Sequence, residues 1–329
     1  MRRFNRLVIT IVLTCAIIAL LIPISVNATR VGDAEITSEA AIVIEFDTGL
    51  VIFELNADEL RVPASMTKMA AVYVVFDAIR DGLVSMDTVA EITNRTSRLS
   101  YSRAFTNVPM PRESSYTIEE LLDVVIVRSA SAATIALGEA IFGSESVLVA
   151  KMNEKAEQLG VIASFSDSWG GSRHNRISAR GMAEMTRQLI MEYPEVLKIT
   201  SKSRVYFDEI PYNSTNPMIG DYEGIDGFKT GFTNPAGWCF SGTAQRGERR
   251  IISVTMGSTI GHRFPDSAVL LDYGFANYNR AIADHFKEAI IQSNPKTIAD
   301  SPLVPIVIYN IETARYLGLR DIAIALNES

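Results

Sequence analysis

The sequence predicts an α+β fold in which strands from both ends of one domain form a single antiparallel sheet around a helical middle. Two β-rich runs come early, helical periodicity fills the middle of the chain, and strand-like runs return near Gly224. The links between neighbouring strands are short, which favours antiparallel pairing. A sheet closed by both ends of the domain is the simplest arrangement of these elements.

The elements follow in this order along the chain. Residues 41–55 form a predicted hairpin, because Asp47-Thr48-Gly49 separates two runs rich in Val, Ile and Phe. The helices predicted next are residues 65–80, 117–127, 132–142, 147–160 and 178–193, and Pro194 stops the last of them. The final elements are strands over 225–229, 237–244 and 250–256 and a helix over 264–279. Beyond residue 280 prolines interrupt the chain, and residues 309–326 are compatible with one more helix.

The N-terminal segment is typical of an export signal. Arg2, Arg3 and Arg6 precede an uncharged apolar stretch, and small or compact residues follow at 26–28. The apolar stretch is nearly long enough to cross a bilayer, so an uncleaved membrane anchor is the alternative. We therefore expect a signal peptide or N-terminal membrane anchor over 1–28, a main domain over 29–280, and a short C-terminal extension over 281–329.

Charge and composition exclude several classes of function. The formal charge of the 329-residue chain is −7, which provides no basic surface for nucleic acid. Outside the signal, Cys239 is the only cysteine, so we expect an exported chain that folds without an internal disulfide. The histidines His174, His262 and His285 lie far apart without a carboxylate cluster, so we expect no bound metal.

The first chemical motif is Pro63-Ala64-Ser65-Met66-Thr67-Lys68, at the start of a predicted helix. On a helix, Ser65 and Lys68 stand one turn apart on the same face, so the lysine amine can reach the serine hydroxyl. A lysine kept neutral by burial can deprotonate that hydroxyl, and the helix N-terminus offers N–H groups to an oxyanion. The alternative is an ordinary helix start with an exposed lysine, since a bare Ser-x-x-Lys is common.

The second motif is Lys229-Thr230-Gly231, on a predicted strand. At a strand edge the lysine and threonine can hold a substrate carboxylate, while the glycine lets a substrate backbone lie close. Lys-Thr-Gly alone is weak evidence and also fits a strand followed by a turn. In this order and at this separation from Ser65-x-x-Lys68, however, the combination is typical of penicillin-binding proteins and class A β-lactamases.

Over about residues 35–280 the chain resembles the low-molecular-weight penicillin-binding proteins that act as serine-type D-alanyl-D-alanine carboxypeptidases. The further segments that carry this resemblance are Asn56-Ala57-Asp58, Asn213-Ser214-Thr215-Asn216, Ala236-Gly237-Trp238-Cys239 and Asp272-Tyr273-Gly274-Phe275. The resemblance implies a β-lactamase/transpeptidase-like fold with a conventionally five-stranded sheet, flanking helices and a mostly helical subdomain. It also implies that residues 29–280 form the DD-peptidase domain, with the active site between sheet and subdomain.

The third family motif, Ser-x-Asn followed by Asp-Ala, is altered here. The chain reads Ser129-Ala130-Ser131-Ala132, so serine replaces the asparagine and alanine the aspartate. Ser129 remains as the hydroxyl that the family uses to relay a proton to the leaving amine. Ser131 still offers a hydrogen bond, but it is shorter than asparagine and lacks the amide's paired donor and acceptor. Both serines are alternatively ordinary polar residues of a loop.

The resemblance implies the chemistry of a carboxypeptidase that trims the terminal D-alanine from peptidoglycan stem pentapeptides outside the cytoplasmic membrane, needs no cofactor, and is acylated by β-lactams. Ser65 would attack the carbonyl with Lys68 as base, and Ser129 would help to protonate the departing D-alanine. Ser131 and Gly231 would bind substrate, and Lys229 and Thr230 would orient its carboxylate. The N–H groups of Ser65 and Phe232 would hold the oxyanion. Arg263 would bind the terminal carboxylate, unless it only forms a surface salt bridge.

Two other functions fit parts of the sequence. A β-lactamase shares the acylation machinery, but the segment between the second and third motifs holds no Glu-x-x-Leu-Asn of the class A kind. A non-catalytic protein that binds stem peptides or a partner without turnover is the other reading, and the change at Ser131 favours it. Residues 281–329 are too few for both the second domain and the C-terminal anchor common in such families, so any membrane attachment is expected through the N-terminal segment.

Overall fold

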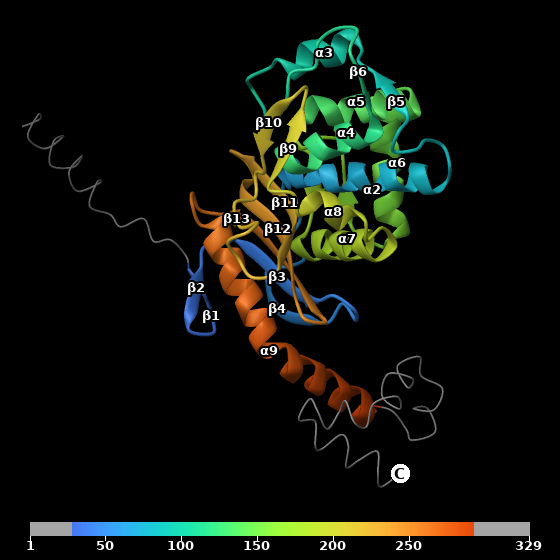
Figure 1. The fold of residues 1–329 in the computed structure, drawn as a ribbon. Helices are drawn as coiled ribbons and strands as arrows, with labels where there is room; N and C mark the ends of the chain where they lie inside the picture. Colours follow the sequence, from blue (N-terminus) through green and yellow to red (C-terminus); the bar gives the residue numbers. More distant parts are fainter. Residues whose placement is uncertain (1–27, 293–329) are drawn as a thin grey trace, which may run out of the picture.

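The computed structural model describes residues 28–292, with side chains described up to residue 285 (Figure 1). The predicted export signal, apart from Ala28, and most of the predicted C-terminal extension, including the helix over 309–326, lie outside the described residues.

A five-stranded antiparallel sheet organises the fold, with strand order β11-β12-β13-β3-β4. The strands are β3 (Ala40–Glu45), β4 (Val51–Leu55), β11 (Ile225–Thr233), β12 (Gly237–Arg246) and β13 (Arg249–Ser258). The N-terminal hairpin and the C-terminal strands meet where β3 pairs with β13, from Met256 opposite Ala40 to Ile251 opposite Glu45. The predicted closure of the sheet by both ends of the domain is therefore confirmed.

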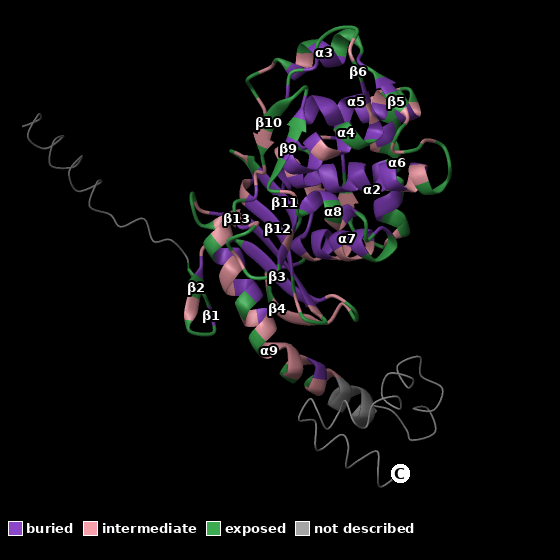
Figure 2. Ribbon diagram, in the orientation of Figure 1, coloured by how far each residue is buried: buried purple, intermediate pink, exposed green. Residues whose placement is uncertain are grey.

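Both faces of the sheet are covered, and the alternation of side chains along β3 shows how. Ile42 and Ile44 point into the core beneath the helical region, whereas Ala41 and Val43 belong to a second core beneath the last helix. Successive residues of a strand face opposite sides, so an uninterrupted apolar run is what a sheet buried on both faces requires. Figure 2 shows this buried sheet between the two layers.

The outer layer consists of α9 (Arg263–Gln292) and a small hairpin, β1 (Thr29–Val31) with β2 (Ala34–Ile36). Figure 1 shows α9 lying along one face of the sheet with the hairpin beside it. The final helix was predicted over 264–279 and extends further, to Gln292. The hairpin was not predicted, because two strands of three residues produce no readable alternation.

The helical region covers the other face. Its helices are α2 (Lys68–Arg80), α3 (Asn94–Ser100), α4 (Ile118–Asp123), α5 (Ser131–Phe142), α6 (Glu145–Gln158), α7 (Ala179–Glu192) and α8 (Val196–Thr200). Short strand pairs connect them: β5 (Val89–Glu91) with β6 (Ser115–Thr117), β7 (Ala163–Ser164) with β8 (Arg176–Ile177), and β9 (Arg204–Phe207) with β10 (Ile210–Asn213). These pairs, α3 and α8 were not predicted.

Two helix boundaries differ from the prediction. The helix expected from Ser65 starts with a 3₁₀ turn over Ala64–Thr67, and α-helical geometry begins only at Lys68. The helix expected over 117–127 consists of α4, which is followed by a π-helical turn over Val124–Arg128. Short 3₁₀ and π segments often occur beside functional sites because they change the direction of the side chains that follow.

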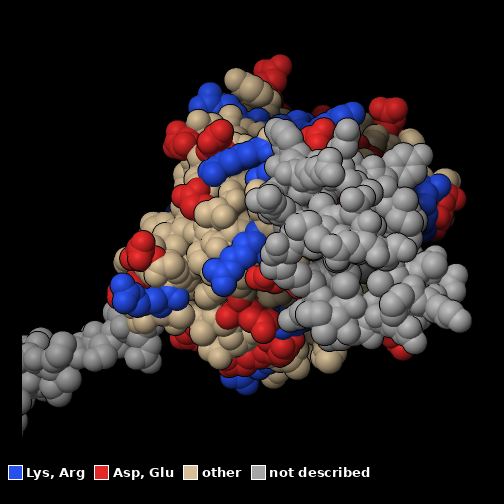
Figure 3. Space-filling model, turned by 90° about the horizontal axis from the view of Figure 1, so that it is seen from below, with Lys and Arg blue, Asp and Glu red and all other residues tan. Residues whose placement is uncertain are grey.

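Within the described part of the chain, no single helix has the length and hydropathy needed to cross a membrane, although α5 and α6 together satisfy both criteria with a 90° bend between them. The described residues also contain no cluster of histidine, cysteine and carboxylate side chains that could hold a metal ion. On the part of the surface visible in Figure 3, acidic and basic side chains are interspersed.

Candidate active site

Ser65 and Lys68 come together as the first motif predicts, although through a 3₁₀ turn. The Nζ atom of Lys68 lies 3.1 Å from the Oγ atom of Ser65, and the lysine is 0% exposed. The same Nζ atom lies 3.2 Å from the Oγ of Ser131 and donates to the carbonyl oxygen of Trp169 at 2.7 Å. The reading of Lys68 as an ordinary exposed lysine is therefore wrong.

The surroundings of Lys68 adjust its basicity. Burial lowers its pKa to about 7, because the charged form loses its hydration, and the negative charge of Asp167 partly opposes this shift. A pKa near neutrality leaves a substantial fraction of the amine unprotonated at physiological pH. Lys68 therefore has both the position and the protonation state of a general base for Ser65.

The loop from Phe165 to Ser172 packs against the 3₁₀ turn that carries Ser65. Asp167 holds the loop together by accepting hydrogen bonds from the N–H groups of Gly170 and Ser172. Gly170 has a φ of +91°, and a Cβ atom at this position would overlap the carbonyl oxygen of Ala64. This close approach places the Trp169 carbonyl within hydrogen-bonding distance of Lys68. Sequence reasoning missed this contact because no local sequence pattern indicates it.

An aromatic pair borders the site on this side. The Trp169 ring packs on Phe105, with ring centroids 4.6 Å apart, and the Lys68 Nζ lies 6.0 Å from the Trp169 ring. A Cβ atom at Gly171 would overlap the Trp169 ring, so the indole occupies its position only because residue 171 is glycine. Sequence reasoning did not single out Phe105 or Trp169.

The altered third motif joins the site through Ser131. Ser131 is the first residue of α5 and is 1% exposed, and its N–H donates to the carbonyl of Thr106 at 2.9 Å. The next N–H, of Ala132, donates to the Oδ1 of Asn107 at 2.8 Å. Asn107 thereby caps a helix whose N-cap residue, Ala130, has no side-chain acceptor. Sequence reasoning missed this partner because it comes from a distant loop.

Ser129 is placed differently from its expected role. It ends the π-helical turn in the left-handed region, with a φ of +66°, and it is buried. Among the hydrogen bonds of the described residues, none joins Ser129 to Lys68 or to Lys229. The structure therefore brings Ser131, and not Ser129, into hydrogen-bonding contact with Lys68.

The Lys-Thr-Gly strand forms the opposite wall. Lys229 is 3% exposed, its Nζ donates to the carbonyl of Thr230 at 3.2 Å, and its pKa is held well below the usual value by burial and then by the nearby charges of Lys68 and Arg263. The Oγ1 of Thr230 donates to the Oγ1 of Thr215 at 2.8 Å. Among the described residues no carboxylate pairs with Lys229, so this strand offers a buried amine without an anionic partner.

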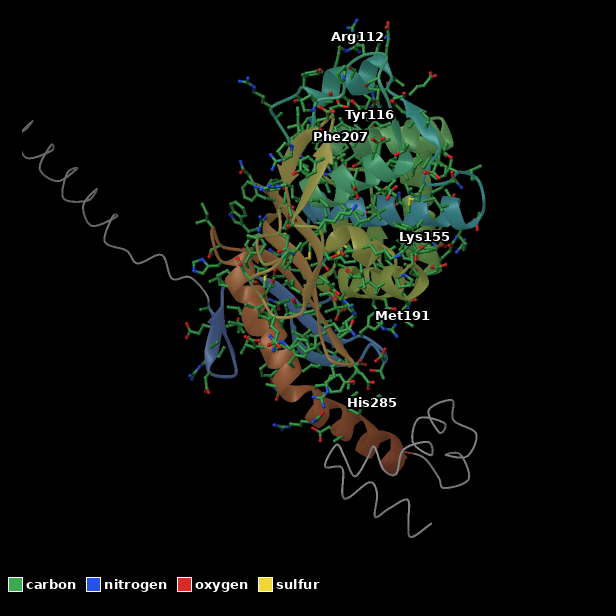
Figure 4. The ribbon with its side chains drawn as sticks, viewed as in Figure 1. Arg112, Tyr116, Lys155, Met191, Phe207 and His285 are labelled. Atoms are coloured by element: carbon green, nitrogen blue, oxygen red, sulfur yellow. The ribbon has the colours of Figure 1, made fainter. Side chains whose placement is uncertain are left out.

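The segment that carries Thr215 follows the β9–β10 hairpin. Phe207 of β9 stacks on Tyr116 of β6 with ring centroids 4.3 Å apart, and Figure 4 shows the two side chains together. After the hairpin, the Thr215 N–H donates to the carbonyl of Val127 at 3.0 Å. The helical region thus fixes the threonine that orients Thr230.

Gly231 and Phe232 continue β11 past the nucleophile. A Cβ atom at Gly231 would approach the carbonyl oxygen of Pro63 to 2.6 Å, so only glycine allows the strand to pack on the nucleophile turn. Phe232 is 45% exposed and stacks on Trp238 with ring centroids 4.3 Å apart. Opposite Gly231 on β12 lies Cys239, which is fully buried and whose pKa is raised to about 11 by that burial.

Arg263 lies at the start of α9, directly beside this strand. Its Nη1 donates to the carbonyl of Gly231 at 3.2 Å, and its guanidinium lies over the rings of Trp238 and Phe264 at 4.7 Å and 4.6 Å. Burial lowers its pKa to about 10. No described carboxylate pairs with it, so the alternative of a surface salt bridge is not what the structure shows.

These contacts define what the site can do. A serine hydroxyl faces a buried and partly neutral lysine, which suits nucleophilic attack on a carbonyl. On the opposite wall, an unpaired guanidinium, a buried amine and a threonine hydroxyl suit an anionic substrate end. A serine acyl transfer on a substrate with a free carboxylate is the chemistry that fits both walls.

Comparison with known proteins agrees with this assignment. The family model described as D-alanyl-D-alanine carboxypeptidase matches residues 27–259. The D-alanyl-D-alanine carboxypeptidase DacF of Bacillus subtilis is 32% identical over 260 residues, which cover 77% of this chain and 66% of the relative. DacA of Haemophilus influenzae is 32% identical over 252 residues, covering 74% and 63%. The chain thus spans slightly less than two thirds of the length of these relatives.

Solved structures give the same result. Penicillin-binding protein 5 from Haemophilus influenzae superposes with a TM-score of 0.72 at 30% identity, covering 75% of this chain and 73% of that one. Penicillin-binding protein D2 from Listeria monocytogenes in its cefotaxime-bound form superposes with a TM-score of 0.66 at 29% identity, covering 72% and 97%. The fold is thus the transpeptidase-like fold of penicillin-binding proteins. The chain belongs to the D-alanyl-D-alanine carboxypeptidase family.

Proposed function

We propose that this chain is a serine-type carboxypeptidase that removes the terminal D-alanine from peptidoglycan stem pentapeptides through an acyl-enzyme, and that penicillins acylate the same serine. One observation carries the proposal: the Ser65 hydroxyl lies 3.1 Å from the amine of the fully buried Lys68. A serine becomes a nucleophile only when a base takes its proton, and burial keeps Lys68 able to do so.

The other site residues take roles in the same reaction. Lys229, Thr230 and Arg263 hold the free carboxylate of the terminal D-alanine, because an amine and a guanidinium that no described carboxylate pairs with line this wall together with a threonine hydroxyl. Gly231 lets the substrate backbone approach β11 as an added strand. The N–H groups of Ser65 and Phe232 hold the oxyanion. The hydroxyl of Ser129 or Ser131 returns a proton to the departing amine, and water then releases the acyl group.

Release of D-alanine from a synthetic stem pentapeptide tests this proposal. Wild-type protein is expected to release D-alanine and to be labelled by a fluorescent penicillin, and Ser65→Ala is expected to do neither. Ser115→Ala, at an exposed position on β6, is the matched control and is expected to behave as wild type. Labelling without release of D-alanine would refute the carboxypeptidase.

A second candidate is a penicillin-binding protein that binds stem peptides or a partner without turnover. It is favoured by Ser131, because a serine stands where the family pattern places an asparagine. Its signature is wild-type protein that is acylated by penicillin and stays acylated for hours with no release of D-alanine. A β-lactamase would instead hydrolyse penicillin within seconds.

We also propose export of the protein to the outer face of the cytoplasmic membrane, where stem peptides occur. Basic residues followed by an apolar stretch support a signal peptide or an anchor. The mass of the N-terminal peptide of protein recovered from cells distinguishes them: cleavage gives a chain that begins near Thr29, whereas an anchor leaves the full mass and a membrane-bound protein.

A further inference from the structure

The Ser131 hydroxyl is placed to act in the reaction itself. Around the Lys68 Nζ stand Ser65 at 3.1 Å, Ser131 at 3.2 Å and the Trp169 carbonyl at 2.7 Å. A neutral amine has two N–H donors and one lone pair. The carbonyl can only accept, so it takes one N–H. The lone pair then suits the Ser65 hydroxyl, whose proton must leave, and the second N–H suits Ser131.

In this arrangement the proton of the Ser131 hydroxyl has no acceptor among the described residues. Thr134, one turn further along α5, donates its hydroxyl to the carbonyl of Ala130 at 3.2 Å. Ser131 is the first residue of the helix, and its hydroxyl makes no such bond to a backbone carbonyl of the described residues. At 1% exposed, it is also shielded from bulk water.

We propose that Ser131 is a catalytic residue that passes the proton from Lys68 to the nitrogen of the leaving group. This proposal rests on the proposed function, since it assigns a role within the acylation of Ser65. An asparagine at position 131 could hold Lys68 through its amide oxygen, but only a hydroxyl can accept one proton while giving up another without leaving its place.

The proton balance is as follows. The Ser65 Oγ forms a bond to the substrate carbonyl carbon while its proton passes to the lone pair of Lys68. The carbon–nitrogen bond then breaks, the nitrogen takes the proton of the Ser131 hydroxyl, and the Ser131 Oγ takes one from Lys68. Lys68 ends neutral, Ser131 ends unchanged, and the proton of Ser65 has reached the leaving amine.

The choice of leaving group separates this role from mere positioning of Lys68. A nitrogen leaving group must be protonated as it departs, whereas a thiol, with a pKa of about 8–9, leaves as a thiolate without a proton. Both reactions need Lys68 to deprotonate Ser65. If Ser131 relays the proton, its loss slows only the reaction with an amide leaving group. If Ser131 merely positions Lys68, its loss slows the amide and thioester reactions alike.

The experiment measures the second-order rate constant for acylation of Ser65 by benzylpenicillin and by an acyl-D-alanyl thioester of mercaptoacetate. For Ser131→Ala the penicillin rate is expected to fall by about 100-fold, the usual contribution of general acid catalysis, while the thioester rate changes by less than about threefold. Ser131→Thr, which keeps a hydroxyl, is expected to restore the penicillin rate.

Equal slowing of both reagents in Ser131→Ala overturns the proposal in favour of a positioning role, and an unchanged penicillin rate overturns it outright. If Ser131→Thr does not fold, the ratio of the two rates in Ser131→Ala still decides. The readout does not need peptide turnover. A wild type that reacts with penicillin but releases no D-alanine refutes the carboxypeptidase while leaving this comparison intact.

Discussion

The pH dependence of acylation tests the role of Lys68 most directly. Burial holds the pKa of Lys68 at about 7 against an ordinary value of 10.5, and Asp167 opposes the shift. Only the neutral amine can take the Ser65 proton, so the rate should follow the neutral fraction. A group of pKa 7 is about 9% neutral at pH 6 and about 91% at pH 8, so the rate should rise about tenfold between them.

The perturbation that sharpens this test is Asp167→Asn. Removing the negative charge removes the influence that raises the pKa of Lys68, so the midpoint of the pH profile should move to lower pH. An asparagine keeps an oxygen that can accept from the Gly170 N–H, but it loses the acceptor of the Ser172 N–H. Asp58→Asn is the control, since Asp58 is an exposed surface carboxylate paired with Arg180.

The assay is the second-order rate of labelling by a fluorescent penicillin, measured by rapid quench from pH 5 to pH 9. Circular dichroism at each pH confirms that the protein stays folded. A rate that is flat across this range, or that rises only towards pH 10, would refute the argument that burial makes Lys68 the base. An equal shift in Asp167→Asn and Asp58→Asn would show that net charge, and not local contact, sets the midpoint.

Three further predictions concern the walls of the site. Gly170→Ala should lower the free energy of unfolding by about 1–3 kcal/mol more than Gly160→Ala in a denaturant titration. Both glycines have positive φ, but only a Cβ at residue 170 would meet a backbone carbonyl, that of Ala64. Equal losses would contradict this close approach. Asn107→Ala should cost about 1 kcal/mol in the same titration, through loss of the external cap of α5, and Asn107→Asp, which keeps the acceptor oxygen, should cost less. Lys229→Gln should slow acylation by penicillin about 30-fold or more, equivalent to about 2 kcal/mol, but barely affect acylation by its methyl ester, because the ester lacks the carboxylate that Lys229 is proposed to bind. Equal slowing of both reactions would argue against this contact.

The sequence was sufficient for the sheet and for the main helices of the fold. The strands β3, β12 and β13 are long and strongly apolar, and α5, α6 and α7 are long and periodic, so local patterns determine them. The short pairs, such as β9 with β10, depend on tertiary contacts and were not predicted. The 3₁₀ turn at Ser65 was also beyond prediction, because the packing of β11 on Pro63 shapes it.

The candidate site was likewise predictable from the sequence only in part. Ser65 and Lys68 are three residues apart, so helical spacing was enough to bring them together. Two partners complete the surroundings of Lys68: the Ser131 hydroxyl and the Trp169 carbonyl. Both come from distant parts of the chain, and the second is a backbone atom with no sequence signature. Ser129 was predicted as the relay by family resemblance, and that role stays a prediction.

Cys239 supplies a chemical reporter of how often the core beside the candidate site opens. Its side chain is fully buried in the core between the sheet and the helical region, and it lies opposite Gly231 on the neighbouring strand, so a thiol reagent can reach it only when this core opens. The rate of its modification therefore measures how often the region behind β11 opens. A ligand that bridges Ser65 and β11 should slow this reaction, because it binds only the closed form. Thiol labelling thus offers a measure of how firmly each β-lactam or peptide closes the site, independent of any catalytic turnover.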